Sequence, residues 1–102
     1  MTRTLYVYGV PWNIELVKAV ILHDGREVAG LTDKDAMYIK VNTKVSKAAQ
    51  RSTLLHEVLH AVHNAHEHDA DEERCVRQVE CGLTSILYDP RNKWFMRFLL
   101  DG

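Results

Sequence analysis

The stretch that decides the fold runs from Ser46 to Asn64 and has the sequence SKAAQRSTLLHEVLHAVHN. It contains neither proline nor glycine, and Ser46 is a typical residue for a helix N-cap. Apolar residues recur at intervals of three and four, which is the spacing of a buried helical stripe. These residues are Leu55, Val58, Leu59 and Val62. The stretch therefore predicts one amphipathic helix that packs against a core.

This helix carries the motif H-E-x-x-H, which spans His56 to His60. Side chains four residues apart on a helix have Cβ atoms ~5–6 Å from each other, so both imidazoles can reach one zinc ion at ~2.0–2.1 Å. Glu57 lies about 100° around the helix from His56, beside the metal but off the line of ligands. It is therefore expected to take a proton from a water molecule that the metal activates. The composition of the chain gives roughly 0.02 chance occurrences of this motif.

A catalytic zinc site normally has three protein ligands, and the sequence offers two sources for the third. The first is His66, whose distance from His60 suits the longer pattern H-E-x-x-H-x-x-G-x-x-H, although position 63 is His63 and not glycine. The second is a glutamate from the next helix, where Glu72, Glu73 and Glu80 are the candidates.

The second helix has an apolar face centred on Val76, Val79 and Leu83. The position of each glutamate relative to this face indicates whether it can bind the metal. A ligand should border the core and leave one side of the metal open, which favours a position at the edge of the face. Glu73 lies at this edge and near the start of the helix, so we predict Glu73 as the third ligand. Glu72 is the reserve.

The first half of the chain is predicted to form strands. Residues 5–8 are rich in β-formers, and residues 36–41 alternate with a period of two, as a strand does. The alternation allows either a core strand or an edge strand that pairs with an extended peptide. Residues 13–20 allow a strand or a short helix. Turns are expected at residues 23–25 and again around Gly30, Thr32 and Asp33.

Two further helices are expected after the histidine-rich helix. One starts near Asp71 and ends before Pro90, and the other covers residues 91–100, where its aromatic side chains are expected to close the core. The predicted fold is α+β: a small N-terminal β-sheet, the H-E-x-x-H helix, a second helix that bears a ligand, and a short C-terminal helix. Residues 1–102 are expected to form a single domain.

Composition excludes several classes of function. The chain has 102 residues, with 13 Lys and Arg against 14 Asp and Glu, which is not the basic balance of a nucleic-acid-binding protein. No apolar run approaches the ~20 residues of a membrane span, and residues 1–12 do not have the pattern of a signal peptide. Cys75 and Cys81 are too far around one helix to pair, so a reducing, cytoplasmic location is expected.

The order of these parts resembles the small zincin-like proteins of phages and prophages, which are similar to the minimal metallopeptidase domain of the ImmA/IrrE group. The resemblance covers about residues 28–90 and is strongest over residues 53–79, from the motif helix to the run Glu73-Arg-Cys-Val76. It implies that His56, His60 and Glu73 bind Zn²⁺ and that Glu57 is the general base. It also implies a protein or peptide as substrate.

The expected function is a zinc-dependent peptidase of gluzincin type, intracellular and encoded by a phage or prophage. A partner protein is expected to supply targeting, because so short a chain has little room for a specificity domain. The alternative is a non-catalytic module in which the same ligands tie two helices together and His63 or another histidine closes the fourth position. His66 and His68 are expected to form a polar turn, or else to hold a second metal.

Overall fold

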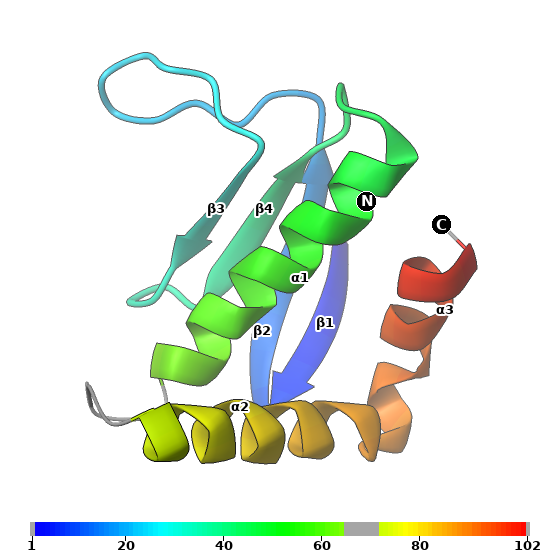
Figure 1. Ribbon diagram of the computed structural model, residues 1–102. Helices are drawn as coiled ribbons and strands as arrows, with labels where there is room; N and C mark the ends of the chain where they lie inside the picture. The colour runs from blue at the N-terminus through cyan, green and yellow to red at the C-terminus, as the bar shows by residue number, and fades with distance from the viewer. Residues whose placement is uncertain (1, 65–71, 102) are drawn as a thin grey trace.

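The computed structural model describes residues 2–64 and 72–101, and its four strands form one sheet in the order β1-β2-β4-β3 (Figure 1). The predicted α+β class is confirmed. The elements are β1 (Thr2–Val7), β2 (Val10–Val17), β3 (Gly30–Asp33), β4 (Tyr38–Asn42), α1 (Lys47–Asn64), α2 (Glu72–Leu87), the 3-10 turn η1 (Pro90–Asn92) and α3 (Lys93–Asp101). Helix α1 crosses the face of the sheet, α2 runs along one end of it, and α3 lies beside β1 (Figure 1).

Strands β1 and β2 form an antiparallel hairpin that turns at Tyr8 and Gly9. Both turn residues have positive φ, 52° and 76°, as a tight two-residue hairpin turn requires. Tyr8 is an uncommon residue in this conformation, and its N–H donates to Ser85 Oγ on α2 at 3.2 Å. The hairpin decides the open prediction for residues 13–20: residues up to Val17 are strand and not helix.

Strand β4 lies in the middle of the sheet, parallel to β2 and antiparallel to β3. Ile39 and Val41 are fully buried on the side that faces α1. The prediction of a strand at residues 36–41 is confirmed from Tyr38 onward, whereas residues 36–37 belong to the turn before it and Met37 has φ of 58°. Of the two predicted forms, the core strand is correct. The strand at this edge of the sheet is β3.

Strand β3 was not predicted, because Gly30, Thr32 and Asp33 were interpreted as turn residues. Four residues with a leading glycine carry little intrinsic strand preference, and the strand exists because β4 provides a partner for it. The earlier turn was predicted correctly: Gly25 has φ of 86°, and Asp24 accepts a hydrogen bond from the N–H of Arg26 at 3.1 Å.

Helix α1 begins where the sequence predicts. Ser46 Oγ accepts a hydrogen bond from the N–H of Ala49 at 3.2 Å, which is the geometry of an N-cap. The buried stripe differs from the prediction at its first position, because Leu54 is fully buried whereas Leu55 is 37% exposed, and Leu59 is half-buried. Val58 and Val62 are buried as expected. Leu54 replaces Leu55 because the sheet covers the side of α1 toward β4.

The buried face of α2 is shifted around the helix from the predicted one toward Gly82, while Leu83 of the predicted face is half-buried. Val79 is 40% exposed, whereas Gly82 and Ile86 are buried. Gly82 lies directly against the side chain of Val62 on α1, so a Cβ built there would clash with Val62 Cγ1. The absence of a side chain at Gly82 lets the two helices approach closely, and this approach sets the rotation of α2.

The C-terminal segment closes the core, as predicted. Phe95 is 1% exposed, and Trp94 Nε1 donates to the carbonyl of Thr4 on β1 at 3.0 Å. Asn92 pairs with the main chain of Tyr6, accepting from its N–H at 2.9 Å and donating to its carbonyl at 2.8 Å. These bonds attach the last helix to the edge of the sheet.

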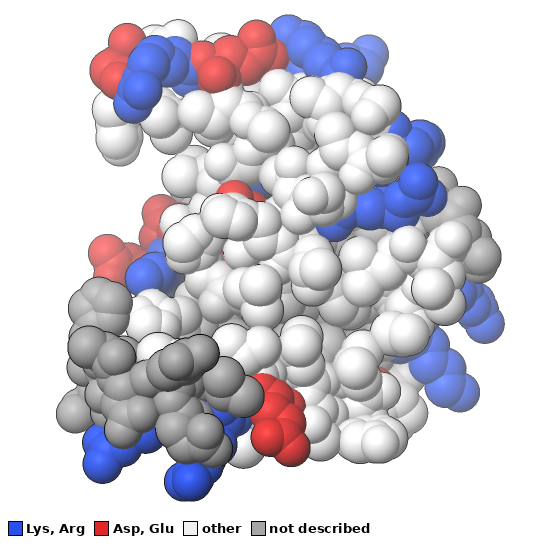
Figure 2. Space-filling model, in the orientation of Figure 1, with Lys and Arg blue, Asp and Glu red and all other residues white. Residues whose placement is uncertain are grey.

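Within the described residues, no helix has the length and apolar content of a membrane span. Neither Cys75 nor Cys81 is in a disulfide. Figure 2 shows charged side chains of both signs over the β2–β3 loop, while the surface over α1 is largely uncharged.

Replacing Gly82 by alanine tests the close contact between the two helices. Because the new Cβ would overlap the Val62 side chain, G82A is expected to lower the free energy of unfolding by about 1–3 kcal/mol, measured by urea denaturation. The double variant G82A/V62A should lose less than the sum of the two single losses. Thr84→Ala, at an exposed position of the same helix, is the control and should change stability by about 0.5 kcal/mol or less. An additive double variant would contradict the contact.

Candidate metal centre

Helix α1 brings His56 and His60 together on its exposed side. Val58 lies between them in sequence and is fully buried, so both histidines lie about 160° from the buried line and within about 40° of each other. Their Nε2 atoms are 3.2 Å apart, and the rings meet edge to face with centroids 4.8 Å apart. The two nitrogens therefore converge on one point outside the helix.

This separation suits joint binding of one zinc ion. Two nitrogen ligands at ~2.0–2.1 Å from a tetrahedral ion are roughly 3.3 Å apart, and the observed distance is 3.2 Å. Imidazole nitrogen is also a preferred donor for zinc. The histidine pair thus fits the metal in both chemistry and spacing.

Glu57 takes a different direction from the histidines. It is 8% exposed and lies against the edge strand β3, where its Oε1 accepts a hydrogen bond from Thr32 Oγ1 at 2.8 Å. A carboxylate this buried needs hydrogen bonds to offset its lost hydration, and Thr32 provides one. Glu57 thus takes a different side of α1 from the histidine pair, and its role as a general base stays a prediction.

A cavity of about 330 Å³ opens beside this carboxylate, between α1 and the start of β3. Its lining residues are Ala29, Gly30, Ser52, Thr53, His56 and Glu57. Gly30 permits the close approach of the strand, because a Cβ there would lie 2.5 Å from Thr53 Cγ2 and 3.1 Å from Glu57 Cγ. His56 and the Glu57 carboxylate therefore line one cavity beside the edge strand β3.

The described residues supply no third ligand: among them, no three His, Cys, Asp or Glu side chains are grouped closely enough to hold a metal. Glu80 is exposed and belongs to no such group. Glu72 and Glu73 are in the first turn of α2, which starts beside the C-terminal end of α1 (Figure 1). Their side chains lie outside what the structure describes, as do His66 and His68 altogether.

The observed rotation of α2 bears on the choice between Glu72 and Glu73 as the third ligand. With the buried line through Gly82 and Ile86, steps of about 100° per residue put position 72 about 80° from Gly82 and position 73 about 180° from it. Position 72 is therefore at the edge of the buried face, where the predicted ligand was expected. Glu73 stays the ligand predicted from the sequence, and Glu72 stays the reserve.

His63 shares the helix with the histidine pair and is half-buried. It lies three residues after His60, on the same side of α1. Its predicted roles, as a fourth ligand or as a helper of the site, stay predictions.

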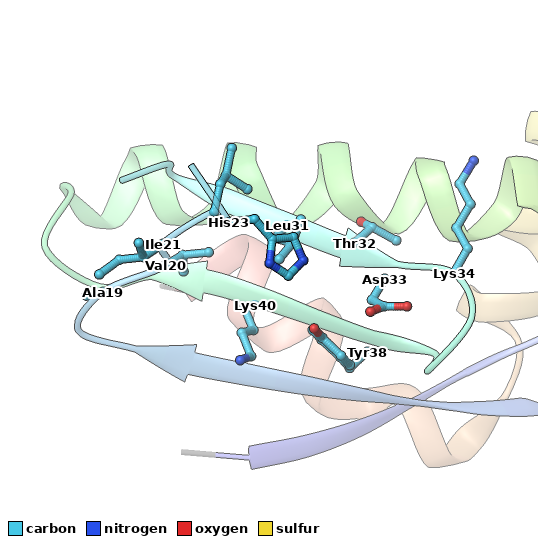
Figure 3. A pocket seen from close by; sticks show the side chains of 11 residues that line it. Ala19, Val20, Ile21, His23, Leu31, Thr32, Asp33, Lys34, Tyr38 and Lys40 are labelled. Carbon is cyan, nitrogen blue, oxygen red and sulfur yellow. The ribbon is translucent and has the colours of Figure 1, made fainter. Parts of the chain in front are cut away.

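A larger cavity, of about 520 Å³, lies on the other face of the sheet, under the β2–β3 loop (Figure 3). It is lined in part by Leu31, Tyr38 and Lys40, which alternate with the residues that face α1. Asp33, at its rim, accepts hydrogen bonds from the N–H groups of Ala36 and Asp35, which hold the pKa of that carboxyl below its ordinary value. This cavity contains none of the predicted ligands.

Sequence reasoning missed Gly30 and Thr32, the two residues of β3 that contact the motif helix. The pattern around them indicates a turn, and a hydrogen bond from Thr32 to Glu57 joins residues that are 25 positions apart. No local signal reports such a contact.

Comparisons of the chain with protein-family models, with curated proteins and with solved structures found no match.

Replacing Gly30 by alanine tests the tight contact between β3 and α1. The variant is expected to lower the free energy of unfolding by about 1–3 kcal/mol, because the new Cβ would press on Thr53 and Glu57. Thr53→Ala removes the closest obstructing atom, so G30A/T53A should lose less than the two single losses together, as measured by urea denaturation. A G30A variant as stable as the parent would contradict the close approach.

Proposed function

We propose that the chain is a zinc-dependent peptidase in which His56 and His60 bind the metal and Glu57 is the general base. The observation that carries the proposal is the 3.2 Å separation of the two Nε2 atoms on the exposed side of α1. Supporting it, Glu57 is held apart from the pair and borders the same cavity as His56.

The third ligand that we propose is a glutamate from the first turn of α2. Glu73 is the residue that the family resemblance implies, and Glu72 is the residue that the buried face of α2 favours. Two imidazoles and one carboxylate are a common donor set for catalytic zinc and leave a coordination position for water or substrate.

When bound, zinc would polarise the scissile carbonyl and make a water molecule acidic enough to ionise near neutral pH. Glu57 supplies the proton transfer. Thr32 occupies its Oε1, and Oε2 is the oxygen that accepts the proton of the attacking water and then delivers it to the amine that leaves.

The substrate class follows from the neighbouring edge of the sheet. Strand β3 is the last strand on that side, and a short extended peptide can pair with such an edge through main-chain hydrogen bonds. A peptide paired there would run past Glu57 and His56. This supports a protein or peptide as substrate; a cytoplasmic location, an origin in a phage or prophage, and a partner for targeting are further parts of the proposal.

Metal analysis tests the ligands. The purified protein is expected to bind one zinc per chain, and His56→Ala or His60→Ala should weaken binding by more than the ~10–100-fold that loss of an outer hydrogen-bond partner costs. Comparing Glu72→Gln with Glu73→Gln identifies the third ligand. His63→Ala is the matched control on the same helix and should keep its zinc; loss of zinc in that variant would favour the non-catalytic alternative with four protein ligands. A parent protein without zinc would overturn the proposal.

Glu57→Gln tests catalysis separately from metal binding. The variant should keep its zinc and its far-ultraviolet circular dichroism, because an amide oxygen still accepts the bond from Thr32. Its peptidase activity should fall by about 10²–10⁴-fold, because an amide cannot accept the proton. The measurement is cleavage of unstructured peptide mixtures followed by mass spectrometry. Activity equal to that of the parent would remove Glu57 from its role.

A further inference from the structure

We propose that Thr32 is the positioning residue for Glu57 and that it links the general base to the strand on which a peptide would bind. The inference rests on the proposed peptidase function and assigns a role to a residue that carries no recognisable motif. It joins two features of the structure, the hydrogen bond from Thr32 to Glu57 and the position of β3 at the edge of the sheet.

The hydroxyl of Thr32 has two acceptors on Glu57. It lies 2.8 Å from the carboxylate oxygen Oε1 and 3.2 Å from the main-chain carbonyl of the same residue. An ionised carboxylate only accepts hydrogen bonds, so the hydroxyl donates to it. The shorter contact, to the charged oxygen, is the stronger one. Thr32 thus holds Oε1, and Oε2 is the carboxylate oxygen that stays available, on the side of Gly30.

The Glu57 side chain is 8% exposed, and Thr32 donates a hydrogen bond to its Oε1. A glutamate has three rotatable bonds, and ordering it costs conformational entropy. Thr32 holds the carboxylate through Oε1, and the missing side chain at Gly30 leaves room for Oε2, because a Cβ added there would lie 3.2 Å from that oxygen. The strand therefore sets the direction of the base before any substrate arrives.

The main-chain N–H and C=O groups of Thr32 point away from β4. The N–H of Asn42 donates to the carbonyl of Ala29 at 2.8 Å, so positions 29, 31 and 33 bond to β4 in the antiparallel ladder. Positions 30 and 32 alternate with them and direct their N–H and C=O groups to the outer edge. Within the part of the chain that the structure describes, no strand pairs with that edge.

One residue therefore serves both sides of the reaction. A peptide that pairs with the outer edge of β3 would bond to the main chain of Thr32, while the Thr32 side chain holds Glu57. Threonine suits both tasks, because its β-branched side chain favours a strand and restricts χ1, so the hydroxyl stays directed at α1.

The first test compares two substitutions of Thr32 in the zinc-loaded protein. Valine keeps the branched shape and removes the hydroxyl, whereas serine keeps the hydroxyl and removes a methyl group. Thr32→Val should lower kcat by about 10–100-fold and leave KM within about twofold, because ordered main-chain binding persists while the base loses its direction. Thr32→Ser should stay within about threefold of the parent. Zinc content should be the same in all three proteins.

A second test needs no peptidase activity, so it separates failure of this inference from failure of the proposed function. In the metal-free protein, Thr32→Val should lower Tm by roughly 4–8 °C through loss of the hydrogen bond to a charged group. In a Glu57→Ala background the same substitution should lower Tm by less than half as much, because the carboxylate partner has gone.

Three results would overturn the inference. They are an unchanged kcat in Thr32→Val at full zinc occupancy, a loss in Thr32→Ser as large as that in Thr32→Val, and the same Tm effect of Thr32→Val with and without the Glu57 carboxylate. If the valine variant does not fold, Thr32→Ala makes the same comparison without a methyl group against the helix. If the parent protein binds no zinc or cleaves no peptide, the proposed function fails, and the Tm comparison still decides whether Thr32 holds Glu57.

Discussion

Burial of α1 against the central strand β4 is the interaction on which the rest of the structure depends. Ile39 and Val41 on the strand, and Leu54 and Val58 on the helix, are all fully buried, and each such side chain contributes about 1.5–3 kcal/mol. Once Val58 faces the sheet, the geometry of the helix leaves no freedom for its neighbours. His56 and His60 must face outward together, and Glu57 must point sideways toward β3.

Two glycines set the distances around this helix. Gly30 lets the edge strand approach Glu57, and Gly82 lets α2 approach Val62. A side chain at either position would push an element away from α1. The site is thus built from contacts in which the absent Cβ atom matters as much as the side chains that are present, and a pattern of polar and apolar residues does not reveal such positions.

The position of the edge strand β3 beside the histidine pair and Glu57 distinguishes this site from an isolated surface pair. The histidine pair alone could hold a metal in many surroundings, and surface pairs of this kind need no function. In the proposed function, the pair lies beside the outer edge of β3, which holds the Glu57 carboxylate and with which an extended peptide would pair. In the proposed function, the hydrogen bond from Thr32 to Glu57 joins the strand on which a peptide would bind to the residue proposed as the general base.

The sequence by itself determined the elements whose signals are local. The Ser46 cap, the helix that follows, the strand at Ile39 and Val41, and the grouping of His56 with His60 all follow from spacings of two, three or four residues. Only the tertiary structure decided the existence of β3, the rotation of α2 and the contact of Thr32 with Glu57. Each of these depends on residues far apart in the chain, so its energy comes from packing and pairing that no local pattern encodes.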